Sequence, residues 1–309
     1  SGKETLVSRK KFPIPAQWQI EEEILTNLGE ILGSDFEVLN GSPQQRTLLL
    51  YDSCEHHLLA YGAALVRGSN QFRIVSASDL ESDVLTSNKR IRHHRPLFWW
   101  DFEPGEFQQI LRTTLELRAA QFFGSVSLER REVSVRNRDG KIIFRFCYQA
   151  AIVNDTRADS RLFAQPLRGY DKEAAQIYRT LSQPPDIDSN PSPLTPRIYQ
   201  LVGKGEIPMS PKSMIQLKPT QTAQDAVTHI ASIMLKIARQ NEPGILDDID
   251  TEYLHDYRVA LRGLRSVLSL VKGAYPKEDT RRLKQTLRDL SQDTNRLRDL
   301  DVYLLKEKE

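Results

Sequence analysis

A row of basic residues recurs at helical spacing near the carboxyl end of the chain. His255, Arg258, Arg262 and Arg265 are separated by three, four and three positions. At 100° per residue these side chains fall within an arc of about 80° and extend over roughly 15 Å of helix. Cationic side chains held in a line form charge-assisted hydrogen bonds to phosphate oxygens. The row therefore predicts a surface that binds a phosphorylated polyanion.

The next helical segment repeats this arrangement. Arg281, Lys284 and Arg288 have the same three-four spacing, and a short break at residues 273–276 separates them from the first row. A short connection makes consecutive helices antiparallel neighbours. None of these basic residues in either row is followed by a carboxylate three or four positions later. We therefore expect both rows to border one groove that suits a chain of phosphates.

A packing role is the alternative interpretation of the two rows. Apolar residues lie beside each row and predict the face that packs in a helical bundle: Leu254, Tyr257, Leu261, Leu264 and Leu268 on the first helix, and Leu283, Leu287, Leu290 and Leu297 on the second. The long stems of Arg and Lys also cover apolar surface. A lone histidine such as His255 beside a core is more often a packing or hydrogen-bonding residue than a metal ligand.

Composition gives no overall attraction to anions. The 43 Lys and Arg residues nearly cancel the 41 Asp and Glu residues, so the formal charge is +2. The chain has two cysteines without CxxC spacing and no run of 18 apolar residues, which favours a reducing, cytoplasmic setting and no membrane contact. Basic helix faces also suit a nucleic-acid backbone, but the helical segment lacks the interleaved aromatic residues that stack on bases.

The chain divides into a strand-rich part and a helical part. Before residue 183, short β-prone runs alternate with helical patterns at residues 16–33, 104–120 and 171–182, and Asp139-Gly140 predicts a β-hairpin turn. A breaker-rich stretch at residues 183–196 predicts a linker or exposed loop. We predict an α+β domain over residues 1–204, a linker over 205–219, and an all-α helical bundle over 220–309.

The helical part resembles the CHAD family, the conserved-histidine α-helical domain. The resemblance rests on HDYRVALRGLRSVLSL, followed about forty residues later by NRLRDLDV. It places six residues on the family's signature positions: His255, Arg258, Arg262, Arg265, Arg298 and Asp299. It implies a twofold-repeated helical bundle that binds inorganic polyphosphate, and a place at polyphosphate granules. Only the first half of such a domain is matched, which implies that a missing segment or a second chain completes the bundle.

The strand-rich part resembles the CYTH family on YDSCEHHLLAYGAALVR, FWWDFEPGEF and LERREVSV. This resemblance implies an antiparallel β-barrel, or tunnel, whose basic residues hold a triphosphate and whose carboxylates hold Mg²⁺ or Mn²⁺. The family's ExExK motif is replaced here by LVSRKKF, and the strands IIFRFCYQAAIV and RLFAQPL contain no acid. We therefore expect a barrel without a metal site, unless Glu103, Glu106 or Glu129 supplies carboxylates.

Three functions follow from these patterns. The first is a non-catalytic polyphosphate-binding protein that needs no cofactor. The second is a triphosphate or short-chain polyphosphate hydrolase that uses Mg²⁺ or Mn²⁺, and the third is nucleic-acid backbone binding. No GxxxxGK, GxGxxG or GxSxG motif occurs. Several basic residues persist on the expected barrel strands and are candidates for a second anion site: Arg9, Lys11, Arg67, Arg73, Arg131 and Arg145.

Overall fold

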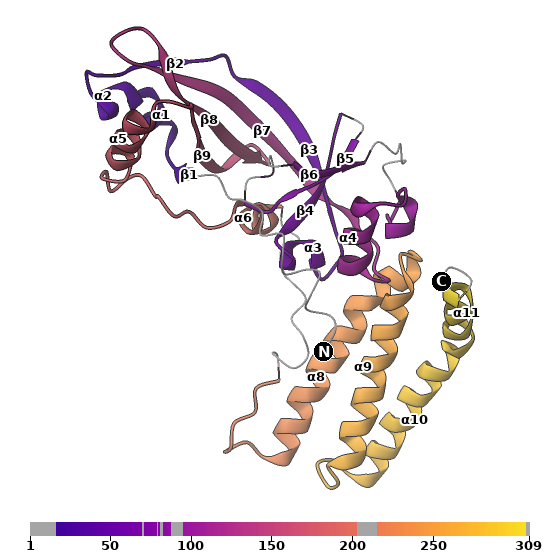
Figure 1. Cartoon of the computed structure of the whole chain (residues 1–309). Helices are drawn as coiled ribbons and strands as arrows, with labels where there is room; N and C mark the ends of the chain where they lie inside the picture. The colour runs from indigo at the N-terminus through magenta and orange to yellow at the C-terminus, as the bar shows by residue number, and fades with distance from the viewer. Residues whose placement is uncertain are drawn as a thin grey trace.

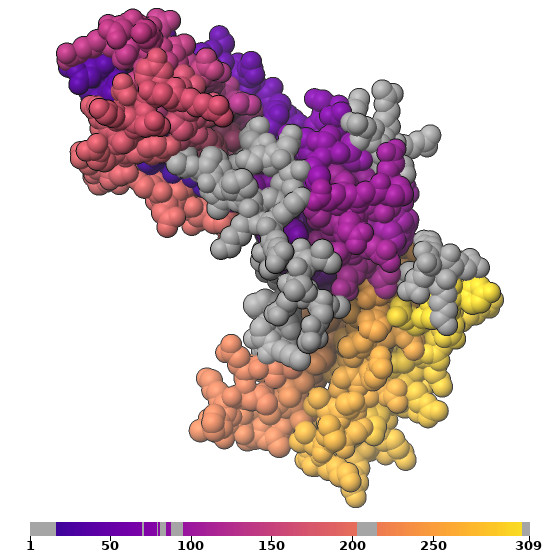
Figure 2. All heavy atoms as spheres, in the orientation of Figure 1, coloured from indigo at the N-terminus to yellow at the C-terminus, as the bar shows by residue number. Residues whose placement is uncertain are grey.

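The structure is a computed structural model that describes residues 17–69, 71–78, 80, 83–87, 95–202 and 215–306. Strands and short helices form one region up to residue 202, and four long helices form a second region from residue 223 (Figure 1). Figure 2 shows atoms of the sheet region, in magenta, against atoms of the helical region, in orange and yellow. The predicted order of an α+β region followed by a helical region is confirmed.

The first region is built on one antiparallel sheet. Its hydrogen-bonded order is β1-β9-β8-β7-β3-β4-β5-β6, and β2 pairs with β7. The strands are β1 (Gln17–Gln19), β2 (Glu37–Asn40), β3 (Gln44–Asp52), β4 (Ala63–Gly68), β5 (Gln71–Ser76), β6 (Asp83–Ser87), β7 (Gln121–Arg136), β8 (Ile142–Val153) and β9 (Thr156–Pro166). Among the described strands, β1 and β6 end the order without pairing with each other, so closure into a barrel is not seen.

The longest strands, β7 and β8, are joined by the predicted hairpin turn. Gly140 has a φ of +72°, a left-handed conformation that glycine adopts without steric cost. The amide of Asn137 donates to the carbonyl of Lys141, and its side chain accepts from the Lys141 amide. The Asp-Gly signal therefore fixed both the position of the turn and the register of the two strands.

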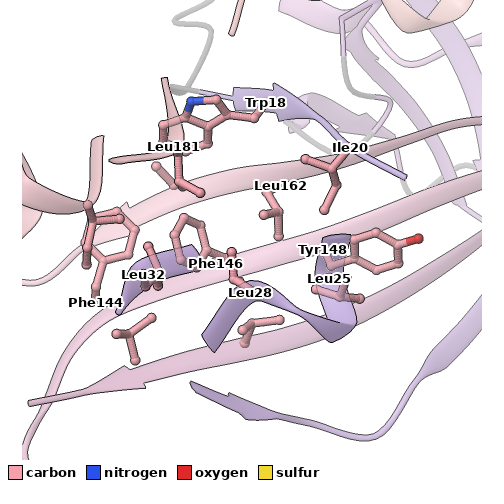
Figure 3. Close-up of a cluster of buried hydrophobic side chains, with 14 of the residues drawn as sticks. Trp18, Ile20, Leu25, Leu28, Leu32, Phe144, Phe146, Tyr148, Leu162 and Leu181 are labelled. Carbon is pink, nitrogen blue, oxygen red and sulfur yellow. The ribbon is translucent and has the colours of Figure 1, made fainter. Parts of the chain in front are cut away.

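Three short helices cover one end of the sheet: α1 (Glu22–Thr26), α2 (Leu28–Leu32) and α5 (Asp171–Leu181). Their apolar side chains point toward Trp18, Phe146 and Leu162 in a shared core (Figure 3). The prediction of one helix over residues 16–33 was wrong. Residues 17–19 pair with β9 as β1, because Trp18 is buried against the sheet, and the helix is interrupted at Asn27.

The other end of the sheet carries α3 (His57–Ala60), the 3₁₀ turn η1 (Trp99–Asp101) and α4 (Glu106–Leu115). Leu111 and Leu115 of α4 pack with buried aromatic residues of the strands, as the predicted helical pattern over residues 104–120 requires. The C-terminal end of α4 therefore lies where the chain turns into β7.

The prediction of a linker or exposed loop at residues 183–196 was wrong at its carboxyl end. The helix α6 (Leu194–Leu201) begins inside this stretch. Leu194 and Ile198, four positions apart, are buried in the core with Leu50 and Val126. This helical spacing outweighs the breaker residues that precede it.

The second region contains α8 (Ala223–Leu246), α9 (Thr251–Leu270), α10 (Lys277–Asp293) and α11 (Asn295–Lys306). Thr222 caps α8, and Asp250 caps α9 through its side chain. The core between α8 and α9 contains Ala238, Leu261 and Leu264. The boundary predicted at residues 205–219 lies mostly outside the described residues.

The apolar face predicted for α10 is only partly used. Leu287 packs against the α8 and α9 core. Leu283 and Leu290 are 42% and 41% exposed, and Leu297, which lies in α11 rather than in α10, is 44% exposed. Leu283, Leu287 and Leu290 lie within about 60° of one another around the helix, so they form one apolar face that is covered at Leu287 and open at the other two positions.

Candidate functional site

A pocket of about 390 Å³ lies between the C-terminal half of α9 and the N-terminal half of α10. Its lining is mostly basic and polar and consists of Arg265, Lys277, Thr280, Arg281, Lys284, Gln285 and Arg288. The antiparallel helices thus bring four of the predicted residues together, Arg265 from α9 and three from α10. The helical spacing of the second row places its members on one face of α10 because three and four residues make about one turn.

The pocket has a large excess of positive charge. Arg265, Lys284 and Arg288 form no ion pair within the described part of the chain. Arg281 is the exception, since its Nη2 lies 2.8 Å from Oε1 of Glu278. The expectation of a row without acidic partners was therefore wrong at Arg281, because a carboxylate lies one turn before it rather than after it. Both side chains are more than 70% exposed, so this pair neutralises little charge.

Lys277, Thr280 and Gln285 line the same pocket and were not predicted. Lys277 lies four positions before Arg281, so a longer search at the same spacing would have found it. It is also the first residue of α10, and the residue before it, Pro276, makes no side-chain capping hydrogen bond. The uncapped amides of the first turn add positive partial charge at this end of the pocket.

Arg258 is held inside the bundle instead of lining the pocket. Its Nη1 donates to the carbonyl oxygen of Ser291 and to Oγ1 of Thr294, both at 2.7 Å. Its Nη2 donates to Oδ1 of Asn295 at 2.8 Å. One guanidinium therefore ties α9 to the end of α10 and the start of α11.

His255 and Arg298 contact each other across α9 and α11. Nη2 of Arg298 lies 3.2 Å from Nδ1 of His255, and Nη1 donates to the carbonyl of Thr251 at 3.4 Å. Because a guanidinium has no acceptor, Nδ1 of His255 accepts, and the ring proton is then assigned to Nε2. Arg262 is exposed and has no ion pair among the described residues. The first row thus splits into a structural part and an open part.

The basic candidates of the sheet do not share one face. Arg9 and Lys11 lie outside the described residues. The strand register places Arg73 and Arg145 on one face, and Arg67 and Arg131 on the other. At most two of these four arginines can therefore belong to one row of cations on a face of the sheet.

Local partners distinguish these sheet arginines further. Arg131 pairs with Glu129 at 2.5 Å and with Glu22 at 3.2 Å. Nε of Arg145 lies 3.6 Å from Glu132. Arg67 is buried, its guanidinium lies 5.3 Å from the centre of the Phe72 ring, and its Nε and Nη1 have no hydrogen-bond partner among the described residues. Arg131 is thus largely neutralised, whereas the described residues place no carboxylate against Arg67.

The carboxylates considered for a metal ion lie apart. Glu106 is the first residue of α4, and Glu103 lies shortly before it. Glu129 is on β7 and is bound to Arg131. In the parts of the chain that the structure describes, no group of three His, Cys, Asp or Glu side chains is arranged to hold a metal ion.

One buried carboxylate of the sheet, Asp52, has a structural role. Its Oδ1 accepts from the amides of Ser53 and Leu58, and its Oδ2 accepts from the amide of Leu59 and the hydroxyl of Tyr199. The pKa of Asp52 is raised to about 6, because the effect of burial is larger than the opposing effect of these hydrogen bonds. The side chain holds α3 against β3 and is enclosed by donors.

Residues 229–308 match the family described as the CHAD domain, so the helical region carries CHAD-domain sequence. A solved structure, that of a candidate adenylate cyclase from Bacillus halodurans, aligns with 14% identity and a TM-score of 0.32. The alignment covers 58% of this chain and 93% of that protein. A search of curated proteins gave no match. Within the described ranges, each helix is too short or too polar to cross a bilayer.

Proposed function

We propose that the protein binds inorganic polyphosphate in the basic pocket between α9 and α10. The observation that carries this proposal is the convergence of Arg265, Lys277, Arg281, Lys284 and Arg288 on one pocket. Among the described residues, a single carboxylate, Glu278, pairs with any of them. A site with this charge excess binds ligands that carry several negative charges.

The shape of the cationic surface suits a linear ligand. From Lys277 to Arg288 the basic side chains follow one face of α10 for about 16 Å, at 1.5 Å per residue. Arg265 faces them from α9. A flexible phosphate chain can therefore contact several cations at once, and each contact releases counterions. The CHAD match of this segment supports the same ligand class.

The lining favours phosphate over nucleic-acid bases. The residues that line this pocket include no aromatic side chain. Sequence-tolerant binding of single-stranded nucleic acid relies on stacking of bases on aromatic rings as well as on backbone charge. Polyphosphate carries charge without bases, so the basic and polar side chains of this pocket are sufficient to bind it. The sheet region serves in this proposal as an accessory region without catalysis.

Retention on immobilised polyphosphate tests the proposal. The triple variant Arg265→Gln, Lys284→Gln and Arg288→Gln removes three pocket cations, and we expect retention at physiological salt to be lost. The matched control, Arg138→Gln, Arg168→Gln and Arg179→Gln, removes three exposed cations of the sheet region and should retain binding. Equal retention by both variants, with the helical circular dichroism signal intact, contradicts the proposal. Competition with single-stranded RNA then separates the two polyanion classes.

A further inference from the structure

A single buried guanidinium joins the sheet region to the helical region. Arg118 lies between α4 and β7, and its side chain is 7% exposed. Its Nη1 contacts Oδ1 of Asp250 at 3.1 Å, and its Nη2 contacts the carboxylates of Glu55 and Asp256. Glu55 belongs to the sheet region, whereas Asp250 and Asp256 belong to the start of α9. Three carboxylates from two regions therefore meet at one cation.

Asp250 has two roles at this contact. As the residue that caps α9, its Oδ1 accepts from the amides of Glu252 and Tyr253 at 3.0 and 3.3 Å. Its Oδ2 accepts from the amide of Ala119 at 3.0 Å, and its side chain is 1% exposed. The same carboxylate thus accepts hydrogen bonds from the first-turn amides of α9 and from the sheet region. The capping of α9 and the docking of the helical region on the sheet region therefore depend on each other.

Tyr253 extends the contact to a second helix. The guanidinium carbon of Arg118 lies 5.0 Å from the centre of the Tyr253 ring, and the Tyr253 hydroxyl accepts from Nε2 of Gln121 at 2.8 Å. The ring also packs closely against Gly244 in the last turn of α8. Arg118 therefore positions the Tyr253 ring, which also packs against the end of α8.

The charge balance makes Arg118 the critical member of this cluster. A cavity of about 310 Å³ beside it is lined by Arg118, His57 and four carboxylates, those of Glu55, Glu116, Glu252 and Asp256. Burial lowers the pKa of Arg118, but the neighbouring Cys54, Glu55, Asp250 and Asp256 raise it above its ordinary value. Without the guanidinium, carboxylates from both regions would face each other with no cation between them.

We propose that Arg118 is an interdomain clamp that makes the two regions one cooperative unit. Its removal leaves the buried carboxylate of Asp250 without a cation beside the partly exposed carboxylates of Glu55 and Asp256, and the three negative charges repel each other across the contact. The contact then opens, and the first turn of α9 loses the environment that holds Asp250 in its capping position. The sheet region is in this view the docking platform of the helical region.

The test compares Arg118→Met with Arg112→Met in the full chain. Arg112 is an exposed residue of α4 whose guanidinium lies 4.8 Å from the centre of the Trp99 ring in the sheet region. For Arg118→Met we expect two unfolding transitions instead of one, and hydrogen-exchange protection of the Glu252 and Tyr253 amides that falls by at least about tenfold. Arg112→Met should behave as wild type. A single transition with unchanged protection in Arg118→Met overturns the proposal.

A rescue variant addresses failure to fold. In Arg118→Met combined with Glu55→Gln and Asp256→Asn, two repelling charges are gone and Asp250 still caps α9. We expect this triple variant to recover one transition and most of the lost protection. If it unfolds like Arg118→Met alone, or does not fold, charge balance is not what Arg118 supplies, and the clamp is rejected. Polyphosphate retention should change in neither variant, because Arg265 lies about 22 Å along α9 from Asp250.

Discussion

Arg258 on α9 donates a 2.7 Å hydrogen bond to the carbonyl oxygen of Ser291 in the last turn of α10. Carbonyls at this position have no partner within their own helix. The Arg258 guanidinium and the Thr294 hydroxyl both donate to this carbonyl, and the guanidinium also bonds Thr294 and Asn295 at the junction with α11. A residue that the sequence pattern assigns to ligand binding is therefore a structural connector, and the open part of the basic row begins beyond it.

Arg258→Met should destabilise the helical region. The substitution keeps the apolar stem but removes three donors, so we expect the free energy of unfolding to fall by about 2 kcal/mol. Urea denaturation followed by circular dichroism measures this change. Arg262→Met, on the same face of α9 but with an exposed side chain, should change stability by less than about 0.5 kcal/mol. Equal effects of the two substitutions would show that the Arg258 hydrogen bonds are not stabilising.

The sequence predicted the basic helix faces but not which of their residues bond within the bundle and which line the pocket. Spacing of three and four determines which residues share a face of a helix, and Arg281, Lys284 and Arg288 of α10 line one pocket. The spacing does not tell how α9 and α10 cross each other. The C-terminal end of α10 lies within reach of the Arg258 guanidinium on α9, whereas a pocket separates the two helices toward the N-terminal end of α10. That difference depends on packing in three dimensions.

The salt dependence of polyphosphate binding should report the pocket cations one by one. For a single-stranded polyanion the slope of log K against log salt is about −0.7 per neutralised phosphate. Lys284→Gln should therefore make the slope shallower by about 0.7. Arg258→Met should leave it unchanged because that guanidinium is occupied by Ser291 and Thr294. Titrations at several salt concentrations measure both slopes, and a slope altered by Arg258→Met alone would place the ligand elsewhere.

The stability of the sheet region should depend on pH through Asp52. Burial raises the pKa of this carboxyl to about 6, so the folded protein binds more protons than the unfolded chain between about pH 4 and pH 6. The contribution of Asp52 to stability is therefore full below about pH 4 and is lost as the pH rises through 6.

Comparison with Asp52→Asn isolates this contribution. The difference in unfolding free energy between wild type and Asp52→Asn should decrease by about 2 kcal/mol from pH 4 to pH 7, since one pKa unit corresponds to about 1.36 kcal/mol. Chemical denaturation across this range measures the difference. A difference that does not vary with pH would mean that Asp52 has an ordinary pKa in the folded protein.

Strand runs were predicted more reliably than the direction of their side chains. The runs that became β3, β4, β5, β7 and β8 could be found from β-branched and aromatic residues and from the turn at Gly140. A shift of one residue reverses every side chain, and the sequence does not fix that choice for strands buried on both faces. Arg67 and Arg73, six positions apart but on different strands, therefore fell on opposite faces. The sequence also did not show which part of the apolar face of α10 is left open, because Leu283 and Leu287 look equivalent in a helical pattern.

Gly244 is where the close approach of α8 and α9 can be tested directly. A Cβ added at this position overlaps the ring of Tyr253, which Arg118 and Gln121 hold in place. Gly244→Ala gains helix propensity, about 1 kcal/mol, but overpacking typically costs 1–3 kcal/mol or more when the neighbour cannot move. We therefore expect a net loss of about 1 kcal/mol and a lower melting temperature.

Gly29→Ala in α2 is the matched control. Its added Cβ meets Val38 at an ordinary 3.9 Å, so this substitution should stabilise the protein slightly. A melting temperature that rises in both variants would mean that the Tyr253 ring is free to move, and the clamp around Arg118 would then be looser than its contacts indicate.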